Sequence, residues 1–75
     1  MSDILQRARI QGAIRRAIER FGDDHKAALD WIETERAQHL YIAHNTRNTF
    51  VRLDSTERAD AYAIAIEQFK LTMKG

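Results

Sequence analysis

Apolar residues recur every three or four positions along most of this 75-residue chain, and no proline interrupts them. Proline removes a backbone donor and breaks a helix interior, so a chain without it can form long, uninterrupted helices. The chain also has no Gly/Ser-rich linker and no internal repeat that would divide it. We therefore expect a single, mainly α domain over residues 1–75, made of three helices.

The first helix is expected over residues 2–21. At about 100° per residue, its apolar side chains fall on one stripe, and this spacing indicates an amphipathic helix. Ser2 is a residue type that caps helix starts, and Gly22 stands where a helix commonly ends in a left-handed residue. The stripe consists of Ile10, Ala13, Ile14, Ala17, Ile18 and Phe21.

Three arginines of this helix, Arg9, Arg16 and Arg20, align on the side opposite the stripe. Arginine matches phosphate and carboxylate geometry with two parallel hydrogen bonds, so this line is a candidate face for an anionic partner. The simpler interpretation is a solvated face, with Glu19 paired to Arg15 or Arg16 within a turn and the acids of the second helix close by. The sequence favours this simpler interpretation.

A second helix is expected over residues 24–40, capped by Asp23 or Asp24. Its apolar positions share one face only if the helix continues past this end, and Arg36 falls in the middle of that face. The helical pattern therefore weakens in the last turns. Trp31 lies about 100° from the centre of the face, so it either starts a second patch or is half-buried against its own fold. The face consists of Ala28, Leu29, Ile32, Leu40 and Ala43.

The third helix is expected over residues 55–73. Asp54 and Glu57 have the spacing of a capping box, with Asp in place of the usual Ser or Thr. Ile64 and Leu71 lie seven residues apart on a second, narrower apolar side. A spare apolar side on a small helical protein indicates self-association, so this pair is a candidate self-association surface. The main apolar stripe consists of Ala59, Tyr62, Ile66, Phe69 and Met73.

Residues 40–53 admit two interpretations. In the first, the second helix runs to about His44 and a loop leads to the third helix. In the alternative, the segment forms a short β-hairpin, because it is rich in Thr, Phe, Val, Tyr and Ile, and Asn favours turns. With either backbone, three apolar residues are expected to pack partly inwards: Phe50, Val51 and Leu53. The polar residues expected to face water are Asn45, Arg47 and Asn48.

The segment 36–53 carries three arginines and no acid. Loops on a rigid scaffold bind partners disproportionately often, and Trp, Tyr and Arg are enriched at binding hot spots. We therefore predict that a partner binds here rather than at the more numerous arginines of the first helix. The predicted partner-binding residues are Trp31, Tyr41, His44, Asn45, Arg47, Asn48 and Arg52.

Composition restricts the chemistry that the chain can perform. The absence of Cys excludes disulfides and thiolate metal sites. His39 and His44 do not have the i, i+4 spacing that aligns two metal ligands on a helix, and no catalytic motif surrounds them. We therefore predict no enzymatic activity, no metal and no cofactor.

No segment is long and apolar enough for a signal peptide or a membrane span, so a cytoplasmic protein is expected.

The predicted function follows from the small size and the uneven surface. A core this small usually provides only about 3–5 kcal/mol of stability, so self-association is expected. We predict a helical protein-interaction module, a homodimer that binds and inhibits or regulates another protein. The alternative is a nucleic-acid-binding regulatory protein that uses the arginines of the first helix or of residues 36–53, although the net charge is only +1. In a third interpretation, His39, His44, Arg47 and Arg52 surround an anionic ligand.

Overall fold

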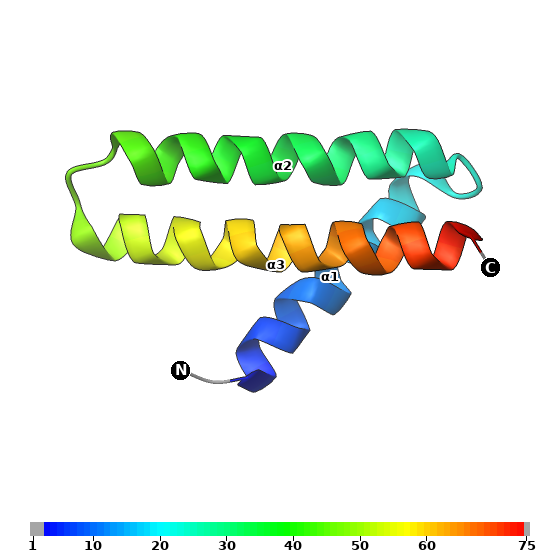
Figure 1. Ribbon diagram of the computed structural model, residues 1–75, viewed down its shortest axis with the longest axis horizontal. Helices are drawn as coiled ribbons and strands as arrows, with labels where there is room; N and C mark the ends of the chain where they lie inside the picture. Colours follow the sequence, from blue (N-terminus) through cyan, green and yellow to red (C-terminus); the bar gives the residue numbers. More distant parts are fainter. Residues whose placement is uncertain (1–2, 75) are drawn as a thin grey trace.

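The computed structural model describes residues 3–74, which form three helices: α1 (Asp3–Phe21), α2 (His25–Asn45) and α3 (Thr49–Lys74). Helices α2 and α3 run antiparallel as a long helical hairpin, and α1 crosses one side of it (Figure 1). The prediction of a mainly α, three-helix structure is confirmed. No strand occurs in residues 3–74, so the β-hairpin alternative within residues 40–53 is wrong.

The link between α1 and α2 forms as the sequence predicts. Gly22 adopts a left-handed φ of 56°, and its amide donates a 2.8 Å hydrogen bond to the Ile18 carbonyl. Glycine favours this way of ending a helix. Asp24 then caps α2, because its Oδ1 accepts a 3.1 Å hydrogen bond from the Ala27 amide. Ser2, the predicted cap of α1, lies outside the described residues.

The link between α2 and α3 is shorter than predicted. Helix α2 continues to Asn45, past the predicted end at residue 40 and close to the end at His44 in the first interpretation of residues 40–53. Helix α3 begins at Thr49, before its predicted start at residue 55. The Asn48 side chain caps α3 by accepting hydrogen bonds from the amides of Phe50 (2.9 Å) and Val51 (3.1 Å). Amides in a first helical turn have no partner within the helix, so this cap stabilises the early start. Residues of types that favour strands therefore lie in helices here.

The core lies where the three helices meet, and Ile32 of α2 is completely buried there. The predicted stripe of α1 is buried or half-buried except at Ile18, which is exposed. This residue lies about 100° around the helix from buried Ala17, past the edge that faces the hairpin. The main stripe of α3 is buried as predicted, apart from Met73, whose side chain lies outside the described part. The buried cluster consists of Ile10, Ala13, Ala17, Ala28, Ile32, Ala61, Tyr62, Ala65, Ile66 and Phe69.

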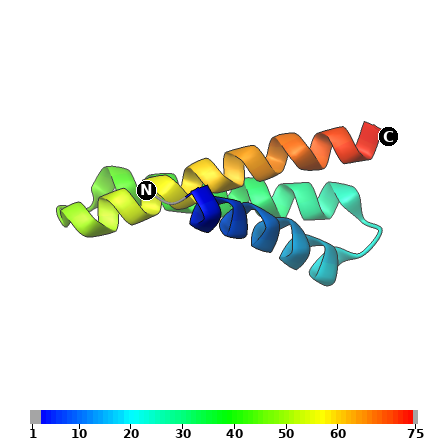
Figure 2. The ribbon, with the colours of Figure 1, turned by 90° about the horizontal axis from the view of Figure 1, so that it is seen from below.

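The core cluster reaches only part of the α2–α3 hairpin. Its α2 members lie in the first half of that helix, its α3 members lie from the middle of α3 onward, and α1 crosses at this end (Figure 2). The opposite end, here called the hairpin tip (residues 40–56), extends beyond the cluster. Small buried residues lie between its two helices, namely Ala43 and Ser55. The molecule is therefore elongated, with dimensions of 40 × 24 × 18 Å. One end, the hairpin tip, contains no member of the core cluster.

Candidate interaction site

Three apolar side chains of the hairpin tip face water. Phe50 is 83% exposed and Leu53 is 57% exposed, and Val51 is exposed to a lesser extent. Helical geometry explains this, because a helix that begins at Thr49 places Phe50 about 180° from buried Ala59. The prediction that these three residues pack partly inwards is therefore wrong. The tip presents an exposed apolar surface instead.

The hairpin tip also carries basic side chains. Arg47 is exposed in the connection between α2 and α3, as predicted, and makes no ion pair with the described residues. The Arg52 guanidinium donates a 2.9 Å hydrogen bond to the Thr46 carbonyl, which closes the connection. The structure also brings Arg52 and His44 together at one groove of about 410 Å³ between α2 and α3. The groove is lined by Leu40, Ala43, His44, Arg52 and Thr56.

No acid within residues 36–53 neutralises these arginines. The next acid along the chain is Asp54, which is already held by Arg9 at 3.3 Å and by Arg58 at 2.8 Å. The tip is therefore locally basic although the whole chain is nearly neutral. A local excess of one charge attracts groups of the opposite charge.

The two asparagines predicted to contact a partner bond within the fold. Asn48 caps α3, and the Asn45 side-chain amide donates a 2.7 Å hydrogen bond to the Tyr41 carbonyl of its own helix. Both residues are exposed, as predicted. In this structure they end one helix and begin the next, and thereby hold the connection that carries Arg47.

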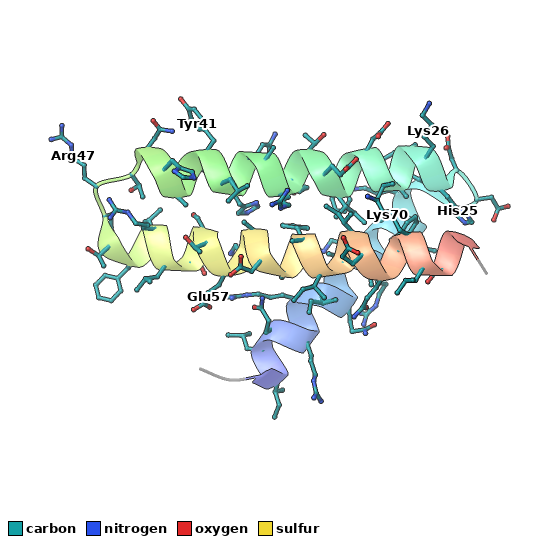
Figure 3. The ribbon with its side chains drawn as sticks, in the orientation of Figure 1. His25, Lys26, Tyr41, Arg47, Glu57 and Lys70 are labelled. Atoms are coloured by element: carbon teal, nitrogen blue, oxygen red, sulfur yellow. The ribbon has the colours of Figure 1, made fainter. Side chains whose placement is uncertain are left out.

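Trp31 and Tyr41 lie on different surfaces. Trp31 is half-buried, with its ring centroid 6.5 Å from that of Phe21 and 5.6 Å from the Arg20 guanidinium carbon. The interpretation of Trp31 as a boundary residue packed on its own fold is confirmed. Tyr41 is 70% exposed and points away from α3 (Figure 3). It lines a second groove, of about 500 Å³, on the outer face of α2. The groove is lined by Thr34, Ala37, Gln38, Tyr41 and Ile42.

The arginine line of α1 is partly engaged within the molecule. Arg9 donates to Glu57 (2.9 Å) and to Asp54 (3.3 Å) of α3, and Arg20 lies over an aromatic ring of α2. The predicted pairing of Glu19 with Arg15 or Arg16 is wrong, because the ion pairs of the described residues join α1 to α3 or lie within α3. Asp54 and Glu57 lie inside α3, so the predicted capping box is also wrong.

Two histidines pack on aromatic rings. His25 lies edge-on to an α3 phenylalanine at 5.8 Å, and the His39 ring lies 5.3 Å from that of Tyr62. Nδ1 of His39 is also 2.7 Å from the Glu35 carbonyl oxygen. Burial, and then the charge of Glu35, raise the pKa of Tyr62, while Arg16 acts in the opposite direction. Within residues 3–74, no three His, Cys, Asp or Glu side chains gather as they would around a metal ion.

Ile64 and Leu71, the predicted self-association pair, are both exposed on α3. Ile18 of α1 is exposed as well. A self-association surface requires such exposure, and the role of the pair stays a prediction.

No protein-family model matches this chain, and comparisons with curated proteins and with solved structures found no match. Among the described residues, no helix combines the length and the apolar character that crossing a membrane requires. The function is therefore inferred from the geometry of the hairpin tip. Its exposed groups can make apolar contacts and charge-assisted hydrogen bonds.

Proposed function

We propose that this chain is a small helical protein-interaction module, a homodimer whose hairpin tip binds another protein and thereby inhibits or regulates it. The observation that carries the proposal is the exposure of Phe50 and Leu53 on a tip that also carries Arg47 and has no acid in residues 36–53. The partner surface that fits this tip has an apolar hollow bordered by carboxylates.

Phe50 contributes most of the apolar contact in this proposal. Fully burying a large apolar side chain stabilises a complex by about 1.5–3 kcal/mol, and aromatic residues and arginine are enriched at interface centres. Leu53 follows three positions later, so it lies on the same side of α3 and extends the contact. Both side chains project from a regular helix. Anchors on a preorganised helix lose less conformational freedom on binding than anchors on a flexible loop.

Arg47 selects for an acidic partner in this proposal. Its guanidinium makes no ion pair with the described residues, so it can donate two parallel hydrogen bonds to a carboxylate without breaking an existing contact. Charges at the rim of an interface mainly raise the association rate and reject wrong partners. Arg52 is held by the Thr46 carbonyl, so its main contribution is to shape the groove between α2 and α3.

A nucleic-acid partner has less support. The net charge of the chain is +1, and Arg9 and Arg20 of the α1 line are engaged within the fold. Binding to phosphates depends on cationic groups that release counterions, and exposed Phe50 and Leu53 add little to it. Binding to DNA or RNA that falls steeply with added salt would favour a nucleic-acid partner over a protein.

Site-specific photo-crosslinking tests the proposal. A photoreactive phenylalanine derivative replaces Phe50 in one protein and Lys26 in the matched control. Lys26 is exposed near the other end of α2 from Arg47 (Figure 3). The proposal predicts that irradiation in a lysate of the source cells attaches one protein species at position 50 and not at position 26. Identical adducts from both positions, or none from position 50, would contradict it.

A further inference from the structure

The groove of about 410 Å³ between α2 and α3 has two kinds of lining. Leu40 and Ala43 of α2 are apolar, while His44 of α2 and Arg52 of α3 are basic. The Thr56 hydroxyl, also in the lining, already donates to the Arg52 carbonyl at 2.8 Å, so covering it leaves no donor without an acceptor. An apolar surface with a few polar groups, in a volume of this size, is typical of a small-ligand site.

The fold holds the Arg52 guanidinium at this groove. One of its N–H groups donates to the Thr46 carbonyl at 2.9 Å, which fixes the side chain against the α2–α3 connection. A guanidinium carries several N–H donors in one plane, so the remaining ones can bind a carboxylate through two parallel hydrogen bonds. Arg52 makes no ion pair with the described residues. A bound anion therefore displaces no existing ion pair.

No acid lines the groove, and residues 36–53 contain none. Asp54 lies about 160° around α3 from Arg52, and it is paired with Arg9 at 3.3 Å on that opposite side. Asp60 is exposed about two turns further along α3, outside the lining. The groove therefore has basic groups at its polar part and no carboxylate to neutralise them.

The charge and the apolar lining together select one class of anion. Arg52 supplies one permanent positive charge, which one carboxylate balances. A phosphate group carries a larger negative charge near neutral pH, and Leu40 and Ala43 offer it no hydrogen bond. An anion with an apolar chain uses both parts of the lining, because its chain can cover these two side chains.

We propose that the groove binds a monocarboxylate carried on a short apolar chain, with the carboxylate at Arg52 and His44 and the chain against Leu40 and Ala43. The carboxylate has two possible sources, namely an acidic side chain or C-terminus of a protein partner, and a free organic acid. The site goes beyond the proposed function, because it needs no contact with Phe50. Only the partner source rests on that function.

Titration with sodium hexanoate tests the site on the purified full chain, followed by the amide chemical shifts in NMR spectra. The shift changes should concentrate at the groove, with a dissociation constant on the order of 1–10 mM. Hexanamide has the same chain without the charge, and inorganic phosphate has charge without the chain. Each should bind about fivefold or more weakly than hexanoate. Equal binding of either one, or no shift change at the groove with hexanoate, would overturn the inference.

Two substitutions test the basic groups. Arg52→Gln removes the charge and should raise the dissociation constant of hexanoate about tenfold or more. His44→Glu leaves the bond between Arg52 and the Thr46 carbonyl intact, places an acid in the groove, and should have a similar effect. Arg47→Gln is the matched control, because Arg47 is an exposed arginine of the same tip outside the lining. Circular dichroism checks the fold of each protein. Unchanged affinity in the two groove variants, or an equal loss in the control, would overturn the inference.

Competition separates the two sources of the carboxylate. The protein that crosslinks at position 50 is bound to the chain with and without excess hexanoate. Loss of binding assigns the carboxylate to that partner, and unchanged binding assigns the groove to a free organic acid. The hexanoate titration needs no partner, so its failure leaves the crosslinking test of the tip unaffected, and a failed crosslinking test leaves the titration valid.

Discussion

Arg9 of α1 lies against Glu57 of α3, with 2.9 Å between its Nη1 and the Oε2 of the glutamate. The same guanidinium reaches Asp54 at 3.3 Å through Nη2, and the Gln6 side chain donates to the Glu57 carbonyl at 3.2 Å. These contacts lie at the border of the hairpin tip, which includes Asp54 and not Glu57. They fix the first half of α1 against α3 where buried apolar contacts end.

Replacing Arg9 with Ala should destabilise the fold modestly. The Arg9 and Glu57 side chains are only partly exposed, so losing the two ion pairs should lower the free energy of unfolding by about 1–2 kcal/mol. Urea denaturation measures this loss, which should shrink at high salt. The matched control is Arg7→Ala, because Arg7 is exposed and makes no ion pair with the described residues; it should change stability by less than about 0.5 kcal/mol. Equal effects of both substitutions would contradict the assigned role.

Replacing Asn48 with Ala should remove the cap of α3. The amides of Phe50 and Val51 then lose their acceptor, at a cost of about 1 kcal/mol. Asn48→Asp keeps an acceptor oxygen and should retain most of the stability. Thermal unfolding compares these proteins with Lys26→Ala, at an exposed residue that makes no ion pair with the described residues, which should stay within about 0.5 kcal/mol of the wild type. A neutral Asn48→Ala protein that binds its partner less well would assign the residue to the interface instead of the cap.

Local chemistry explains which parts of the fold can be predicted. Gly22 ends α1 and Asp24 caps α2 because both act on neighbouring amides and carbonyls, and local patterns reveal such residues. The α2–α3 connection is harder to predict, because its side chains favour strands. Asn48 is itself a good capping residue, and this signal could have indicated the early start of α3. An Asn favours a turn as well as a helix cap, and the packing of α3 against α2 decides that Asn48 acts as a cap here.

The candidate site could be located from the sequence, but its geometry could not. The lack of acids in residues 36–53 identifies the basic segment directly. Phe50 is exposed because it belongs to the first turn of α3. When the segment is taken as a loop or a hairpin, the same side chain is expected to pack partly inwards. Arg9 and Glu57 are 48 positions apart, so no local pattern indicates that they meet. The half-burial of Trp31 likewise depends on where α1 crosses the hairpin.

Alanine at Arg47 and at Arg52 should separate binding from stability. Arg52→Ala removes the hydrogen bond to the Thr46 carbonyl and should cost about 0.5–1.5 kcal/mol of unfolding free energy. Arg47→Ala removes no bond to the described residues and should cost less than about 0.5 kcal/mol, while weakening partner binding. Urea titrations measure both proteins. An Arg47→Ala protein as destabilised as Arg52→Ala would make Arg47 a structural residue.

Stability should fall at alkaline pH because of Tyr62. Burial first, and then the charge of Glu35, raise the pKa of this phenol above its ordinary value, 10.0. The folded chain therefore holds the phenol proton more tightly than the unfolded chain does. This contribution to stability is fully present below the unfolded pKa, and it is lost as the pH rises through the folded pKa. Urea titrations across this range should show a smaller loss for Tyr62→Phe than for the wild type. Tyr41→Phe, at an exposed ring, should behave like the wild type.

The most direct test of the central claim compares two exposed apolar residues of α3. Phe50→Asp changes the hairpin tip, and Leu71→Asp makes a similar change near the far end of the same helix. Both proteins are measured for binding to the protein that crosslinks at position 50, with helicity checked by circular dichroism. The tip proposal predicts that Phe50→Asp raises the dissociation constant by about tenfold or more, while Leu71→Asp binds like the wild type. Undiminished binding by Phe50→Asp, or an equal loss in both proteins, would contradict it.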